Sequence, residues 1–388
     1  MDFGWNDDQE AIRAEVRRIM ARFDNSYWRE QDRAHTFPEA FYQAMAAGGW
    51  LGVAMPEAYG GAGLGITEAA MVLQEVSASG ACMSGASAIH MNIFGVNPLV
   101  VHGTEEQKKA WLPDIIQGRT KVAFGVTEPD VGLDTTHIRT RAVRQGEHYR
   151  IEGKKVWIST AQVADKILLL ARTTPIEEVS RPSDGLSLFF TDLDRSAIDV
   201  REIDKCGRAA VDSNELFIDG LMVPASHLLG EEGRGFSYLL DGLNPERILV
   251  AAEAIGIGQV SLATAAGYAR ERVVFGRPIG QNQAVQHPLA ESWAELEAAS
   301  LLVYKAAWLY DNGKPCGPAA NAAKYLAAEA GFRAADRAMQ VLGGMGYSKE
   351  FHVERYWREG KLTRMVPVSP ELILCHIAER VLGLPKSY

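Results

Sequence analysis

Residues 122–134, VAFGVTEPDVGLD, combine residue types that could bind an electron-rich ligand. A short apolar run precedes a turn that contains Pro129, Asp130 and Gly132. Such a turn leaves backbone N–H groups unpaired, and together with the Thr127 hydroxyl they suit the edge of an electron-rich ring or a phosphate. The same residues would serve equally well as a strand and turn in any β-rich domain, because turn chemistry is not specific to binding sites. The rest of the chain has to decide between the two interpretations.

Two further places carry side chains suited to chemistry. Trp157 and Ser159 lie two positions apart, and a tryptophan in a strand is as often a core residue as a stacking surface. Glu246 follows Asn244 and Pro245, and the three fit the N-cap, first position and first-turn acid of a helix. The same carboxylate could act as a general base if burial raises its pKa against the effect of the helix dipole.

Several classes of site find no support in the sequence. The nine histidines include no His-Glu-x-x-His and no evident metal cluster, so no metal site is expected. The glycine-rich loop at residues 55–65, MPEAYGGAGLG, is not a dinucleotide fingerprint, and neither a P-loop nor a Gly-x-Ser-x-Gly elbow is present. The cysteines, which are Cys82, Cys206, Cys316 and Cys375, are too far apart in sequence for a zinc motif.

Composition restricts the partners and the setting. The 388 residues suffice for two or three domains, and 47% of them are hydrophobic, which supplies a large core. The net charge of −9 and the absence of a Lys or Arg run disfavour nucleic acid and anionic membranes as partners. An acidic amphipathic N-terminus, no apolar run of about 18 residues and separate cysteines together predict a reduced, cytoplasmic protein without membrane insertion.

Hydrophobic spacing divides the chain into three parts. Apolar residues recur at helical intervals up to about residue 119, short alternating runs follow, and the helical period returns after about residue 233. We therefore predict a helical domain over residues 1–120, a β domain over 121–230 and a helical bundle over 231–388. The expected strands are 139–143, 148–151, 166–171, 186–191 and 214–218, and the expected long helices are 247–275, 283–312 and 319–342.

Four separate segments together resemble the acyl-CoA dehydrogenase family. TEPDVGLD at 127–134 is similar to the family's T-E-P-x-A-G-S-D, and KVWIS at 155–159 has its Trp-Ile-Ser register. ERVVFGRPI at 271–279 resembles E-R-x-x-F-G-x-x-I, and QVLGGMGY at 340–347 resembles Q-x-x-G-G-x-G-[FY]. The resemblance implies a mostly α fold with an N-terminal helical domain, a middle β-barrel and a C-terminal four-helix bundle.

By this resemblance the cofactor is FAD. Trp157 would pack against the isoalloxazine ring, Ser159 would hydrogen-bond near its N5, and Arg272 would bind the pyrophosphate of a neighbouring subunit's FAD. A site shared between subunits implies an oligomer, and because family members are dimers of dimers we expect a homotetramer. The cofactor contacts implied by the resemblance are Phe124, Val126, Thr127, Gly132, Leu133, Trp157, Ser159, Arg272, Phe275, Gln283, Gln340, Gly343, Gly344, Ser369 and Glu371.

The chain departs from the family at the catalytic base. Most members carry a Glu in R-D-x-K-x-x-x-I-Y-E-G-T, but Pro367 occupies that slot here. Isovaleryl- and long-chain acyl-CoA dehydrogenases place the base in L-x-x-E-R-x-V-x-A, which residues 243–251 resemble, so Glu246 is the expected base and Glu253 a second candidate. Pro367 also lacks the N–H that binds the thioester carbonyl in the family, a loss of about 3 kcal/mol of transition-state stabilisation. The expected substrate contacts are Arg247, Leu133 and Pro367.

The resemblance implies an FAD-dependent acyl-CoA dehydrogenase. It would convert an acyl-CoA, or an acyl-carrier thioester, into the trans-2-enoyl product and pass the electrons to an electron-transferring flavoprotein. Because Leu133 and Pro367 alter the substrate side, two alternatives stay open. One is a flavin monooxygenase or oxidase of the same fold that acts on a non-thioester substrate, and the other is a non-catalytic FAD-binding subunit.

Overall fold

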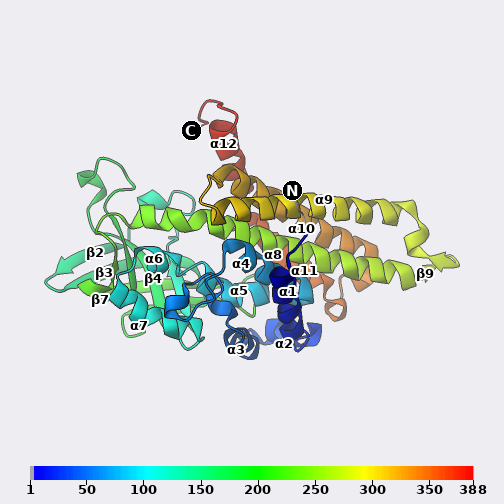
Figure 1. The fold of residues 1–388 in the computed structure, drawn as a ribbon, viewed down its shortest axis with the longest axis horizontal. Helices are drawn as coiled ribbons and strands as arrows, with labels where there is room; N and C mark the ends of the chain where they lie inside the picture. The colour runs from blue at the N-terminus through cyan, green and yellow to red at the C-terminus, as the bar shows by residue number, and fades with distance from the viewer. Residues whose placement is uncertain (1–3, 388) are drawn as a thin grey trace.

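The computed structural model describes residues 4–387, and its first part is helical (Figure 1). The helices begin at good capping residues: Asn6 and Thr104 each form a capping box with the glutamine three positions later. A short π-helical turn, Ser77–Ala81, separates two helices that pack into the centre of the molecule. The helices are α1 (Asp7–Met20), α2 (Asn25–Ala34), α3 (Glu39–Ala47), α4 (Ile66–Val76), α5 (Cys82–Ile93), α6 (Asn97–His102) and α7 (Glu105–Ile116).

The middle part is a β domain of two connected strand groups. One group has the order β6-β7-β3-β2, the other β1-β4-β5-β8, and they join where Arg141 pairs with Arg172. The pairing path ends at β6 and β8, which do not pair with each other within residues 4–387, so hydrogen bonds do not close the sheet into a ring. The strands are β1 (Val122–Gly125), β2 (Arg141–Gln145), β3 (His148–Ser159), β4 (Lys166–Arg172), β5 (Leu186–Asp192), β6 (Ile198–Glu202), β7 (Ser213–Pro224) and β8 (Leu228–Leu229).

The last part is a helical bundle. Its long helices α8 (Gly235–Glu271), α9 (Gln283–Asp311) and α10 (Gly317–Leu342) pack along one another, and α11 (Val353–Met365) packs on α10 and α8. A small hairpin of β9 (Val273–Val274) and β10 (Arg277–Pro278) connects α8 to α9, while α12 (Pro370–Arg380) projects from the side of the bundle (Figure 1). Together these elements give the mostly helical, three-part architecture expected from the sequence.

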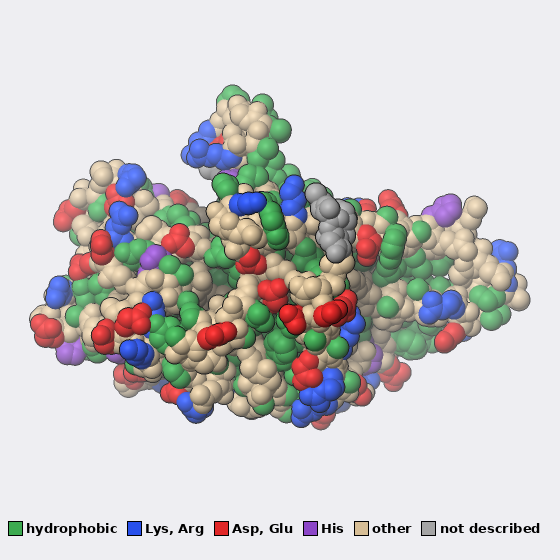
Figure 2. Space-filling model, in the orientation of Figure 1, with side chains coloured by type: hydrophobic (Ala, Val, Ile, Leu, Met, Phe, Trp, Pro, Cys, Tyr) green, Lys and Arg blue, Asp and Glu red, His purple; other side chains and the backbone are tan. Residues whose placement is uncertain are grey.

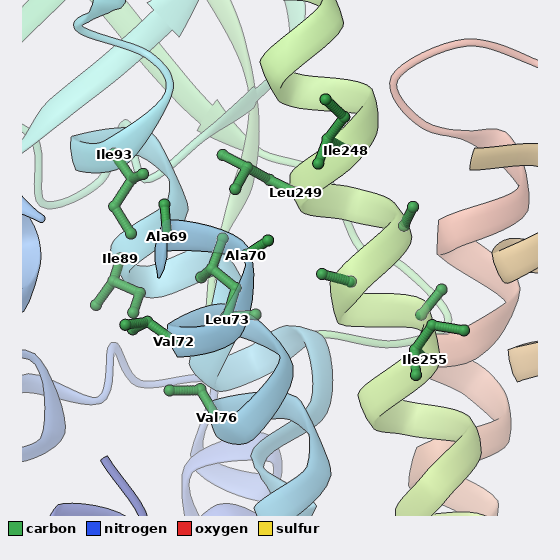
Figure 3. Close-up of a cluster of buried hydrophobic side chains, with 14 of the residues drawn as sticks. Ala69, Ala70, Val72, Leu73, Val76, Ile89, Ile93, Ile248, Leu249 and Ile255 are labelled. Carbon is green, nitrogen blue, oxygen red and sulfur yellow. The ribbon is translucent and has the colours of Figure 1, made fainter. Parts of the chain in front are cut away.

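The largest core lies where the first and last parts meet. One buried apolar cluster includes Leu73 of α4, Ile89 of α5 and Ile248, Leu249 and Ile255 of α8, and Figure 3 shows Leu249 pointing toward α4 and α5. These residues are buried, and apolar surface removed from water is the main term that stabilises such a contact. The contact fixes α5 against α8, which positions the site described below.

Helix α8 differs from the sequence prediction at both ends. It begins at Gly235 and ends at Glu271, so Pro245 lies inside the helix and Asn244 does not cap it. The prediction read Asn244-Pro245 as a start signal because proline is usual at a first helical position, but residues 235–243 already have helical conformation. Glu246 therefore lies in a helix interior, away from the first turn where the helix dipole acts.

Helix α8 is also the one helix, among residues 4–387, that is long and apolar enough to cross a membrane. Of its most apolar window, 72% is buried inside the molecule, as expected of a core helix. On the outer surface, Figure 2 shows Lys and Arg side chains interspersed with Asp and Glu over the face in view.

Candidate active site

Strands β1 and β3 bring residues 122–134 and 155–159 together into one surface, which we call the flavin wall. Beyond the end of β1, Thr127 O accepts a hydrogen bond from Val156 N at 3.0 Å, which joins the two segments. In the turn that follows, Val131 N donates to Glu128 O, whereas the N–H groups of Gly132 and Leu133 have no protein acceptor in the described structure. The wall therefore offers free backbone donors beside the Thr127 side chain.

A buried ion pair anchors this wall from behind. Lys155 Nζ donates to Val126 O at 3.0 Å and to Glu128 Oε1 at 2.9 Å. Glu128 in turn accepts from the backbone N–H groups of Arg139 and Thr140. Burial lowers the pKa of Lys155 to about 8, although the Glu128 carboxylate opposes that shift. The turn conformation is thus set by hydrogen bonds to its carbonyl and carboxylate groups, which leaves the outward face free.

Trp157 turns its ring away from the core. The β3–β7 register shifts between Lys155 and Ile158, and Trp157 adopts a left-handed backbone conformation with φ of 61°. Its side chain is consequently one of the exposed large apolar groups, at 58% exposure, as is Leu133 at 59%. Left-handed conformations in non-glycine residues cost about 1–3 kcal/mol each and concentrate at functional sites. Thr160 and Arg208 nearby also have positive φ, of 62° and 58°.

Arg208 is a site residue that the sequence did not reveal. It is half-buried, and its Nη2 donates to Ser159 Oγ at 3.0 Å and to Ser213 Oγ at 2.7 Å. Its Nε has no hydrogen-bond partner in the described structure. Nothing in the local sequence Cys-Gly-Arg marks this arginine as functional, because its contact with Ser159 spans 49 residues.

Glu246 differs from the other enclosed carboxyl groups. Among the described residues its carboxylate has no hydrogen-bond or ion-pair partner, while burial raises its pKa to about 7, against the lowering effect of His90 and Arg247. Glu359 is the other carboxyl group whose pKa is raised, but Glu359 accepts from Ser84 N and Oγ at 2.8 Å each. An unpaired carboxyl group with a pKa near neutrality has the properties of a general base.

Glu253, the second candidate, is already engaged. It is fully buried, and its Oε1 lies 2.7 Å from His90 Nδ1. A group held in this way is a poorer acceptor for a substrate proton than the free Glu246 carboxylate.

The loop between α11 and α12 carries Pro367 and Ser369. Lys324 Nζ donates to Arg364 O and Val368 O at 3.1 and 2.7 Å, and so holds the loop against α10. Ser369 caps α12 by accepting from Leu372 N. Glu371, which follows in the first turn of α12, is exposed. Arg247, on α8, donates to Leu243 O and to Asn244 Oδ1.

The structure does not bring all predicted cofactor residues together within one chain. Arg272 and Phe275 lie at the β9–β10 hairpin, with Gln283 at the start of α9, at the opposite end of the long axis from β2, β3 and β7 (Figure 1). Gln340 and Gly343 line a cavity of about 1370 Å³ that also contacts Arg29, Lys205 and Arg358, and the adjoining Gly344 is exposed. The hairpin that carries Arg272 and Phe275 is therefore too far from β3 to contact a flavin at Trp157 of the same chain.

Comparison with known families assigns all three parts of the chain. Residues 6–119 match the acyl-CoA dehydrogenase N-terminal domain, residues 123–221 the middle domain and residues 233–382 the C-terminal domain. The acyl-CoA dehydrogenase FadE12 of Mycobacterium tuberculosis is 37% identical over 99% of this chain and 98% of its own length. The chain belongs to the acyl-CoA dehydrogenase family.

Solved structures of acyl-CoA dehydrogenases have the same fold as this chain. Butyryl-CoA dehydrogenase from Megasphaera elsdenii superimposes with a TM-score of 0.93 at 30% identity, covering 98% of this chain and 100% of that one. A glutaryl-coenzyme A dehydrogenase in complex with glutaryl-CoA gives a TM-score of 0.94 at 32% identity, covering 100% and 98%. The protein is an oxidoreductase of this family that acts on a CH–CH bond of acyl-CoA thioesters.

The family is FAD-dependent, and the wall in this acyl-CoA dehydrogenase has the chemistry that a flavin needs. An isoalloxazine ring has aromatic faces and a hydrogen-bonding edge. Trp157 presents an exposed aromatic face, and the free N–H groups of Gly132 and Leu133 with the Thr127 side chain supply donors beside it.

Proposed function

We propose that this enzyme dehydrogenates an acyl-CoA to the trans-2-enoyl-CoA with Glu246 as the catalytic base. The observation that carries the proposal is the free Glu246 carboxyl group, whose pKa of about 7 leaves a large share ionised at neutral pH. In the reaction the α C–H bond breaks, its proton goes to a Glu246 oxygen, and a C=C bond forms as hydride leaves the β carbon. FAD, when bound, supplies the two-electron acceptor for that hydride.

The chain's own residues position the reactants. Thr127, Trp157 and Ser159 would hold the flavin ring, with Arg208 fixing the Ser159 hydroxyl by the 3.0 Å hydrogen bond. Arg272, Phe275, Gln283, Gln340, Gly343 and Gly344 would contact the cofactor across a subunit interface, so we propose a homo-oligomer, as a tetramer. The reduced enzyme would pass its electrons to an electron-transferring flavoprotein.

The experiment is an anaerobic titration of the FAD-loaded protein with butyryl-, isovaleryl-, octanoyl- and phenylpropionyl-CoA. We expect at least one of them to bleach the flavin's visible absorbance, and Glu246→Gln to slow that bleaching by about 10²–10⁴-fold. Asp241→Asn, a change of an exposed carboxylate on the same helix, should leave the rate unchanged.

Other outcomes would contradict the proposed base or support one of the alternative functions. Bleaching of Glu246→Gln at the wild-type rate would remove Glu246 as the base. A wild-type protein that none of the acyl-CoAs bleaches would favour the non-catalytic subunit. Fast reoxidation by O₂ with a hydroxylated product would favour the monooxygenase.

A further inference from the structure

A buried ion pair lies near the proposed base and takes no part in the transfer of the proton or the hydride. His90 Nδ1 on α5 and Glu253 Oε1 on α8 are 2.7 Å apart, and their side chains are 10% and 0% exposed. Glu253 Oε2 has no hydrogen-bond partner in the described structure, so the pair is incompletely satisfied. Burying such a pair is a poor route to stability, because desolvation of both groups offsets their attraction.

The pair lies on the Glu246 side of α8. Glu246 and Glu253 are seven residues apart, which is close to two helical turns, so their side chains leave the same face of the helix. Once Nδ1 binds Glu253, the hydrogen bonds of residues 4–387 leave His90 Nε2 without a protein partner. The His90 ring also packs at 5.5 Å on Phe94, which packs at 5.3 Å on Phe124 of the flavin wall.

We propose that His90 is a positioning residue for Glu246: Glu253 keeps the imidazole charged, and that charge stabilises the carboxylate form of Glu246. This inference rests on the proposed function, because it takes Glu246 as the base. The carboxylate is the form that can accept the α proton of the substrate.

The charged groups around His90 and Glu246 shift the pKa values of these two residues in the directions that the proposal requires. Burial lowers the pKa of His90 and Arg208 acts in the same direction, but Glu253 and Glu246 raise it, and the net shift is upward. At Glu246, burial raises the pKa to about 7, His90 and Arg247 lower it, and Glu253 raises it. Loss of the His90 charge should therefore move the Glu246 pKa further upward, so that the base form appears only at higher pH.

The test measures removal of the α proton alone. A 3-thiaacyl-CoA has sulfur at the β position and cannot deliver a hydride, so exchange of its α hydrogens in D₂O reports the base without flavin reduction. We expect the wild-type exchange rate to rise with pH through about 7. In His90→Gln an upward shift of about one pKa unit would make exchange roughly tenfold slower at pH 6 and equal within about twofold at pH 9.

Two variants guard against a purely structural effect. His102→Gln removes a similar pair, His102 with Asp241, where Asp241 is more than half exposed, and it should leave the pH profile unchanged. The double variant His90→Gln/Glu253→Gln leaves no unpaired buried charge from this pair. The pH profile of its exchange rate should lie between those of the wild type and His90→Gln. FAD content and melting temperature are measured for every variant.

The outcomes separate the two hypotheses. If Glu246→Gln still exchanges the α hydrogens, the proposed function is wrong. If Glu246→Gln is inactive but both His90 variants keep the wild-type pH profile, only the role of His90 is overturned. A rate that falls equally at all pH values would also overturn that role, since a charge effect must depend on pH.

Discussion

Single residues at this site act through partners that lie far away in the chain. Ser159 is held by Arg208, Glu253 by His90, and the turn after β1 by Lys155 and Glu128. Glu246 is set apart by having no such partner within residues 4–387. The candidate base was predictable from the sequence because a local motif surrounds it. The sequence could not predict that the Glu246 carboxyl group is free whereas those of Glu253 and Glu359 are hydrogen-bonded.

The wall behind the flavin should depend on the Lys155–Glu128 pair. Lys155→Met leaves Glu128 buried with one partner fewer, and removing one member of a buried pair costs about 3–5 kcal/mol. We expect a lower melting temperature and a lower FAD content, measured by calorimetry and by the ratio of visible to ultraviolet absorbance. The double variant with Glu128→Gln should recover part of both losses, whereas a single variant as stable as wild type would contradict this role.

Elements follow the sequence where hydrophobic periodicity is strong and depart from it where buried polar groups interrupt the pattern. The sequence predicts a strand over 148–151, but β3 extends to Ser159. The prediction is too short because Lys155, a charged residue buried in an ion pair, interrupts the alternation of apolar and polar residues. Strand β6 was missed because its five residues, IDVRE, are largely charged. Helix α8 begins earlier than predicted because tertiary contacts hold Pro245 inside a helix.

Close contact between α8 and α10 should depend on glycine. A Cβ at Gly331 would lie 2.2 Å from Ala254 O, and this backbone atom cannot move aside alone. We expect Gly331→Ala to lower the melting temperature by several degrees, which corresponds to about 1–3 kcal/mol of overpacking. Gly317→Ala lies at the start of the same helix with open space around it, and it should change the melting temperature very little. Equal melting temperatures for the two variants would show that the helices can separate without cost.

At the scale of the whole molecule, predicted cofactor residues lie at both ends of the long axis. Figure 1 shows the β9–β10 hairpin at one end of the long axis and the β domain at the other. Phe275 at the hairpin is 100% exposed, with Val273 and Val274 exposed beside it. An exposed apolar tip next to Arg272, which we predict to bind the FAD pyrophosphate, fits a hairpin that completes the site of a second copy.

Arg272 should therefore matter for FAD binding more than for folding. Arg272→Ala removes a charge-assisted contact of about 1.5–3 kcal/mol, so FAD affinity should fall roughly 10- to 150-fold while the apoprotein's melting temperature is unchanged. Arg270→Ala, two positions earlier and also exposed, is the matched control. Flavin titration together with light scattering checks both affinity and assembly. Unchanged FAD affinity in Arg272→Ala would refute the shared site.

By itself the sequence determined the order of helical, β and helical parts, which depends on neighbours along the chain, and it predicted a binding segment at residues 122–134 and Glu246 as the base. Only the tertiary structure decided which ionisable groups meet. His90 and Glu253 are 163 residues apart, and no local pattern records such a pairing. The pKa of a carboxyl group depends on its desolvation and on charges supplied by other elements, so the pKa of about 7 at Glu246 is a property of the packed molecule.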